Sequence, residues 1–144
     1  MKKYTYPALF CFLLSLFSLA SANDDNKAAD RTSLGFTPQE KTEFLAEMRE
    51  MLSSIQKIMM GIGTENRELI ISAAHYSGNR MARNTPQSIK QKTPQNFKEI
   101  GGSTHMMFEE LVVRAEADDM STLAEFTGGL MQKCVACHAI YKAN

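Results

Sequence analysis

The stretch TPQEKTEFLAEMREMLSSIQKI, residues 37–58, has the clearest helical pattern in the chain. Thr37 can cap a helix that starts at Pro38, and Glu40 stands where a capping-box glutamate is expected. Apolar residues then recur at three- and four-residue steps, at Phe44, Met48, Met51, Ile55, Ile58 or Met59, and Ile62. This spacing predicts a helix over 38–62 with one apolar stripe, ended by Gly61 and Gly63.

Three further segments have helical periodicity, and no useful length alternates with the period of a strand. We expect helices over 65–82, 94–117 and 121–142, with a polar connector over 84–93. Caps are expected from Thr64, Thr93 and Asp118 or Asp119. The apolar positions predict an inward face at Leu69, Ala73, Tyr76, Met81, Phe97, Ile100, Thr104, Phe108, Leu111, Ala115, Leu123, Phe126 or Thr127, Leu130, Cys134, Cys137 and Tyr141. Mostly short connections between four amphipathic helices predict an all-α, antiparallel four-helix bundle.

Two glycine pairs interrupt the predicted helices, Gly101-Gly102 in the third and Gly128-Gly129 in the fourth. Each glycine costs about 1 kcal/mol relative to alanine inside a helix. The pairs indicate either close approach of another helix or a flat cofactor, or simple tolerance.

The N-terminus has the pattern of an export signal. Lys2 and Lys3 precede an apolar run over 8–19, and Ala20-Ser21-Ala22 has the small residues of a cleavage site. We expect a signal peptide over 1–22, a flexible segment over 23–35 and one helical domain over 36–144. No later segment is long and apolar enough to cross a bilayer, so we expect a periplasmic protein without membrane insertion after signal cleavage.

The charge balance excludes some classes of function. The chain has 16 basic and 16 acidic residues, and cleavage would remove Lys2 and Lys3, leaving a small negative charge. Such a chain lacks the basic surface of a nucleic-acid binder. No nucleophile–base pair, carboxylate pair or phosphate-binding loop stands out, so we do not expect an enzyme.

The run Cys134-Val135-Ala136-Cys137-His138 carries the main chemical signal. Two thiols at positions i and i+3 of a helix project from the same side and can reach the two vinyl groups of one haem edge. His138 can then bind the iron as the proximal axial ligand. The run therefore predicts one covalently attached haem c.

Three alternatives use the same cysteines. With Cys11 removed in the signal, the remaining pair could form a disulfide. A thioredoxin-type redox pair normally opens a helix after a strand, whereas this pair lies near the end of the last helix. A structural zinc site would need further ligands from a second pair, which the sequence lacks.

The short tail after His138 contains no methionine or histidine, so a sixth iron ligand must come from upstream. Met51 and His105 are the main candidates, and both lie close to predicted inward faces. Met48, Met59, Met60, Met106 and Met107 are interpreted as core, and His75 as exposed or structural.

The C-terminal run Cys134-Val135-Ala136-Cys137-His138-Ala139-Ile140-Tyr141-Lys142, on the last of four helices, resembles cytochrome c′ and its low-spin relatives, the class II c-type cytochromes. The resemblance implies a four-helix haem domain whose first helix covers the distal face of the haem. High-spin members of the family have an apolar residue there, and low-spin members have a methionine.

The same resemblance extends to the first helix. Arg49-Glu50-Met51-Leu52-Ser53 is similar to the family's Arg-Gln run, with glutamate in place of glutamine. Strict spacing puts Ser53 over the iron, and a shift of less than one turn brings Met51 or Leu52 there. The resemblance implies a haem propionate contact for Arg49.

Two functions are therefore expected. The first is one-electron transfer with redox partner proteins, for which Lys133 and Lys142 could shape a docking surface. The alternative is a five-coordinate protein that binds the small gases NO or CO beneath an apolar residue such as Leu52. The resemblance is compatible with a homodimer.

Overall fold

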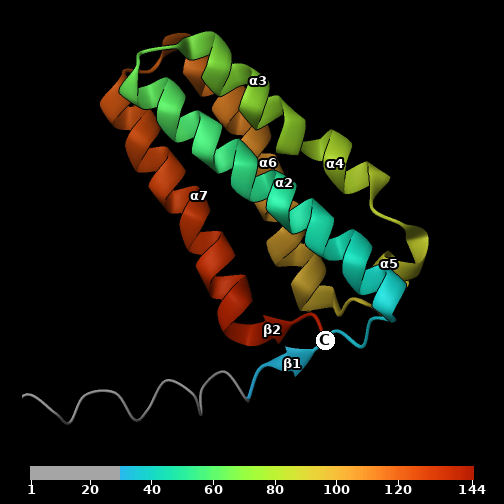
Figure 1. Ribbon diagram of the computed structural model, residues 1–144. Helices are drawn as coiled ribbons and strands as arrows, with labels where there is room; N and C mark the ends of the chain where they lie inside the picture. Colours follow the sequence, from blue (N-terminus) through green and yellow to red (C-terminus); the bar gives the residue numbers. More distant parts are fainter. Residues whose placement is uncertain (1–29) are drawn as a thin grey trace, which may run out of the picture. The chain divides into compact units, whose positions relative to one another are not determined.

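A computed structural model describes residues 30–144, and this part of the protein is almost entirely helical (Figure 1). The all-α prediction is confirmed. The predicted signal peptide lies outside the described residues. The elements are β1 (Thr32–Ser33), α2 (Pro38–Gly63), α3 (Arg67–Ser77), α4 (Asn79–Asn84), α5 (Gln87–Lys92), α6 (Gln95–Ala117), α7 (Met120–Ile140) and β2 (Tyr141–Lys142).

The start of α2 follows the predicted capping box. The Thr37 hydroxyl accepts from the Glu40 amide at 3.3 Å, and the Glu40 carboxylate accepts from the Thr37 amide at 2.8 Å. The same carboxylate accepts from Lys92 of α5 at 2.5 Å. These bonds, with that from Lys92 first, lower the pKa of Glu40 to about 2. The cap therefore also ties α5 to the first turn of α2.

The second predicted helix is divided in two at Gly78. This glycine is the N-cap of α4 and supplies no side-chain cap. The Glu109 carboxylate of α6 replaces that cap by accepting from the Asn79 amide at 2.7 Å. A Cβ at Gly78 would lie 2.2 Å from the same carboxylate. A side chain from another helix therefore makes the break, which the local pattern does not reveal.

Other local predictions were wrong. The polar connector expected over 84–93 contains α5, whose Ile89 is fully buried. Asn66, not Thr64, caps α3, and Thr93 ends α5 rather than capping α6. Tyr76, expected to face inward, is half exposed and lies near Glu50 of α2.

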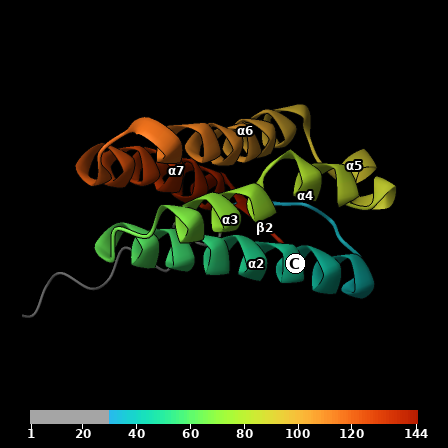
Figure 2. The same ribbon diagram turned by 90° about the horizontal axis from the view of Figure 1, so that it is seen from above.

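The long helices pack in consecutive pairs, α2 with α3, α3 with α6 and α6 with α7, and α2 also packs against α7 (Figures 1 and 2). Their shared apolar faces form the central core. Its largest fully buried members come from every long helix: Ile58, Ile70, Phe108, Leu111, Leu123 and Leu130. None of the helices within 30–144 combines the length and apolar character needed to cross a membrane.

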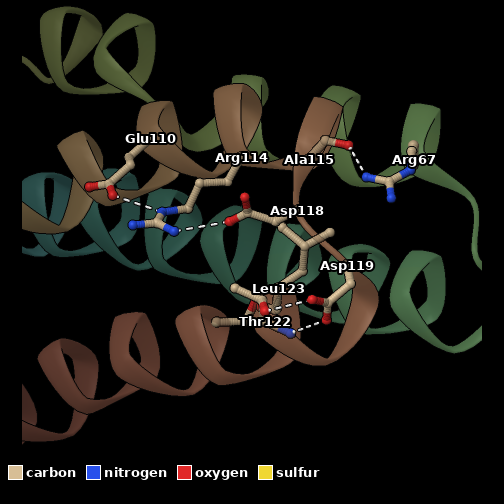
Figure 3. A network of polar contacts seen from close by, with 9 residues as sticks. Arg67, Glu110, Arg114, Ala115, Asp118, Asp119, Thr122 and Leu123 are labelled. Carbon is tan, nitrogen blue, oxygen red and sulfur yellow. Dashed lines mark hydrogen bonds and ion pairs between the residues drawn. The ribbon is translucent and has the colours of Figure 1, made fainter.

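The turn between α6 and α7 is fixed by polar contacts (Figure 3). Arg114 donates to Glu110 at 2.8 Å and to Asp118 at 2.9 Å. Asp119 caps α7 as predicted and accepts from the Thr122 amide at 2.9 Å. Arg67 of α3 donates to the Ala115 carbonyl at 2.6 Å, which supplies a partner for the end of α6. These contacts set the direction in which α7 leaves the turn.

A second apolar cluster, here the terminal core, lies where the two ends of the described chain meet. It consists of Leu34, Phe36, Phe44, Ile89 and Tyr141. The rings of Phe36, Phe44, Phe97 and Tyr141 follow one another with centroid distances of 5.1, 5.9 and 5.3 Å. This cluster joins the start of α2 to the end of α7.

Residues 31–34, which belong to the segment expected to be flexible, contact the C-terminal end of the chain in the structure. Strand β1 pairs with β2 in parallel, with Thr32 opposite Tyr141, and the Leu34 amide donates to the Lys142 carbonyl at 3.0 Å. Leu34 itself is buried. The compact unit therefore begins at Arg31 and not at Phe36.

The glycine pairs do not mark close contacts. A Cβ at Gly101, Gly102 or Gly128 would meet nothing within 4 Å, and one at Gly129 would lie 3.9 Å from Met107. The close approach is instead at Gly61, where a Cβ would lie 2.6 Å from Ile70 Cγ1. Gly61 therefore lets α3 pack directly on α2.

We predict that Gly61→Ala destabilises the protein by about 1–3 kcal/mol, because the added methyl forces Ile70 or the α3 backbone to move. Gly102→Ala is the matched control on exposed helix, with an expected gain of about 0.5–1 kcal/mol from helix propensity. Urea unfolding of the full chain, followed by circular dichroism, measures both. Equal stability of the two variants would contradict the close packing at Gly61.

Candidate haem-binding site

The two predicted haem-attachment residues lie one turn apart on α7, and both thiols are free and half-buried. Cys134 packs against the central core, and Cys137 packs against the terminal core. The pair therefore lies where the two apolar clusters meet. The disulfide considered from the sequence is not formed.

The environment of the thiols disfavours the thiolate. Burial raises the pKa of Cys134, and burial together with the neighbouring Cys134 raises the pKa of Cys137. Both residues lie in the last turns of α7, at the negative end of the helix dipole. A thioredoxin-type pair has the opposite arrangement, with a thiolate stabilised at a helix N-terminus.

His138 is exposed and follows Cys137 directly. The flank of α7 on which His138 lies can be deduced from helical geometry, because residues seven positions apart share a face. Phe126 lies under Arg114 of α6, and Gly129 lies near Met107 of α6. His138 and Met131 lie on the other flank of α7, away from these contacts with α6. Helix α2 is the other long helix that packs beside α7.

On α2, the flank opposite α3 is apolar. Ser54 bonds to Ser77 of α3, and Glu50 lies near Tyr76 of the same helix, which fixes the side that faces α3. Leu45, Leu52 and Met59 lie seven residues apart on the opposite flank, and Leu52 is 68% exposed. This flank therefore presents apolar side chains to an exposed surface.

The last ten residues of α7 are unusual for a helix of a packed domain. No residue of α7 after Leu130 is buried, although Met131, Val135 and Ile140 are apolar and 43%, 69% and 40% exposed. Exposed apolar side chains beside two half-buried thiols fit a bulky apolar group bonded to those thiols. The residues present therefore suit a covalent haem.

Comparison with protein-family models, curated proteins and solved structures returned no match. The assignment of the site therefore depends on the chemistry and geometry of the chain itself. Among residues 30–144, no three His, Cys, Asp or Glu side chains gather in a way that could hold a metal ion.

The candidates for the distal face differ in position. Met51 is half-buried and packs against the central core, and Met48 is half-buried against the terminal core, to which Cys137 also belongs. Ser53 lines a recess between α2 and α3 with Tyr76, so it lies on the flank turned towards α3. Met59, Met60 and Met106 were interpreted as core, but they are 46%, 54% and 56% exposed.

His105 is engaged inside the protein. It is 7% exposed; its Nδ1 lies 2.7 Å from the Ser77 carbonyl, and its Nε2 lies 3.9 Å from the Glu47 carboxylate. Burial raises the pKa of Glu47, against the bond from Thr85 that lowers it. The sequence analysis did not identify Glu47. The one feature of the sequence that could have marked it is the position of a charged residue next to the apolar stripe of α2. In this arrangement both ring nitrogens of His105 face protein groups.

The remaining candidates lie at the surface or in the terminal core. Arg49 and His75 are exposed, and so is Lys133. Tyr141 is buried against Phe97 of α6, and Asn96 donates to its hydroxyl at 3.4 Å. The expected inward position of Tyr141 is confirmed, whereas the propionate contact of Arg49 stays a prediction.

The sequence analysis missed Arg31, which lay in the segment expected to be flexible. Its guanidinium Nη1 donates to the His138 carbonyl at 3.3 Å. Nothing in the local sequence links these two residues, which are 107 positions apart.

We predict slow alkylation of both thiols in the reduced apoprotein. Because the pKa of each is raised, the thiolate fraction at neutral pH is small, and the rate should rise only above the ordinary cysteine pKa of about 8.5. Iodoacetamide labelling over a pH series, read by mass spectrometry, measures this. Labelling in urea is the control and should follow an ordinary thiol. Fast labelling of the folded chain below pH 7 would indicate a redox-active pair instead.

Proposed function

We propose that this protein is an exported c-type haem protein that transfers single electrons in the periplasm. The observation that carries the proposal is the pair of free thiols on adjacent turns of α7, followed directly by an exposed histidine, at the junction of two apolar cores. We propose no enzymatic turnover, because redox shuttling needs only the iron and partner proteins.

The fold that we propose for this function is an antiparallel four-helix bundle similar to that of cytochrome c′. The second helix of the bundle would consist of α3 and α4. The packing of consecutive long helices, and of the first against the last, supports this topology. The resemblance of the C-terminal run to class II c-type cytochromes supports the same assignment.

In this proposal Cys134 and Cys137 hold one haem c through two thioether bonds, and His138 is the proximal ligand. The haem supplies one-electron chemistry at its iron when bound. The chain's own residues exclude water: Cys137 packs with the terminal core, and the Leu45, Leu52 and Met59 flank of α2 gives apolar cover. Arg49 would neutralise a propionate from the exposed side of α2.

A sixth ligand would make the iron low-spin and keep its reorganisation on electron transfer small, and for this ligand we propose Met51. Its half-buried position on α2 supports this choice, and a thioether ligand favours a raised reduction potential. The buried contacts of His105 make that residue the weaker candidate.

The second candidate function is the binding of NO or CO by a five-coordinate haem. The observation that favours it is the exposure of Leu52 on the flank of α2 opposite α3, where an apolar residue would cover the iron without binding it. A homodimer is compatible with both proposals.

We predict covalent haem in the full chain when it is produced together with haem-attachment machinery. Replacement of both Cys134 and Cys137 by alanine should abolish haem staining on a denaturing gel, because no thioether can form. Val135→Ala is the matched control, since this exposed residue lies between the two thiols and takes no part in attachment. A wild-type chain without covalent haem would refute the proposal.

We predict that the ferric protein is low-spin and that its ferrous form resists carbon monoxide. Met51→Leu should make it high-spin and allow rapid binding, because leucine keeps the volume but removes the ligand. Met48→Leu, one turn earlier on the same helix, is the control and should leave the spectrum unchanged. Absorption spectra of ferric and ferrous forms, with and without carbon monoxide, decide this. A high-spin wild type that binds carbon monoxide rapidly would favour the gas-binding function.

A further inference from the structure

We propose that Arg31 is a positioning residue that fixes the backbone at His138 and thereby orients the proximal ligand. The N-terminal segment over 31–36, here the strap, lies across the end of α7 and carries this residue (Figure 1). The inference rests on the proposed haem function and adds a role for a segment outside the attachment motif.

The first observation concerns the hydrogen-bond partners of the last backbone carbonyls of α7. The last carbonyls of a helix lack partners within it. The Tyr141 amide still donates to the Cys137 carbonyl, but Tyr141 itself has extended backbone. The His138 carbonyl is therefore the first beyond this last helical bond, and the Arg31 guanidinium donates to it at 3.3 Å. A charged donor also complements the negative end of the helix dipole.

The second observation is that Arg31 itself is held in register. Thr32 pairs with Tyr141 and Ser33 pairs with Lys142, and the Leu34 amide donates to the Lys142 carbonyl at 3.0 Å. Arg31 and Leu34 thus hydrogen-bond to the segment over 138–142, and the two residues between them pair with its last two residues. The same register places Arg31 level with Ile140, from where its side chain reaches back to the His138 carbonyl.

The third observation is the anchoring of the strap by burial. Leu34 and Phe36 are 5% and 7% exposed in the terminal core, against which Cys137 packs. Phe36 also contacts Phe44 of α2, with ring centroids 5.1 Å apart. The strap therefore links the start of α2 to the end of α7 through buried side chains.

The strap matters because this part of α7 is weakly packed. Between Leu130 and Tyr141 the helix has no buried residue, and its contacts with the two cores are those of the half-buried Cys134 and Cys137, to which the strap adds a contact at His138. An axial histidine needs a defined ring orientation, which depends on how firmly its backbone is held. The guanidinium charge next to His138 would also disfavour ferric iron and raise the reduction potential.

The test compares Arg31→Ala and Arg31→Lys with Lys133→Ala. Lys133→Ala removes one exposed positive charge from α7 but leaves the contact to the His138 carbonyl, so it controls for the loss of a surface charge, whereas Arg31→Lys keeps the charge beside His138. The first readout is amide hydrogen exchange over 138–142, in the apoprotein and in the haem-loaded protein. The second is the reduction potential by spectroelectrochemistry, which a merely structural role would not move.

We expect Arg31→Ala to speed exchange over 138–142 several-fold and to lower the potential more than Lys133→Ala does. Arg31→Lys should restore part of both, because an ammonium group can still donate. Unchanged exchange, or a potential shift no larger than that of Lys133→Ala, would overturn the proposal. If the wild type takes up no haem, the haem function fails, and exchange in the apoprotein alone then supports or overturns the fixing of His138.

Discussion

The burial of Leu123, Thr127 and Leu130 in the first half of α7 is the constraint on which the arrangement of the site depends. These residues fix the helix against α6, and the polar turn around Arg114 sets its direction. The second half of α7 continues from this fixed base without a buried residue of its own. The thiols are thus carried by a rigid element yet lie at the edge of the packed core.

The sequence predicted the long helices well and the short elements badly, for physical reasons. Helices α2, α6 and α7 have enough turns for an apolar stripe, and α2 and α7 also have caps that act within a few residues. The break at Gly78 depends on Glu109 from α6, and α5 is held by Ile89 and Lys92 against distant residues. A strand of two residues has no period to detect. The proposed attachment motif is local, so the sequence alone predicts it, whereas the Arg31 contact exists only after folding.

One flank of α2 contacts polar and ionisable side chains, and the opposite flank is apolar. Towards α3, α4 and α6, Glu47 lies among Thr85 and His105, and Ser54 bonds to Ser77. The opposite flank contributes leucine and methionine. A group placed beside α7 would therefore meet a low-dielectric surface, while the ionisable side chains of the domain interior lie across the helix from it.

The pairing of β1 with β2 has a consequence for the order in which the molecule assembles. Arg31 and His138 are separated by 107 residues, so their contact closes a loop that spans nearly the whole folded unit. Closing such a long loop has a large entropic cost, so the contact between the two residues is favourable only after the intervening helices have docked. We therefore expect the strap to fix the Cys134–His138 segment in the last step of folding, after the helices have packed. Until then the segment that carries Cys134 and Cys137 lacks its hydrogen bond to the strap.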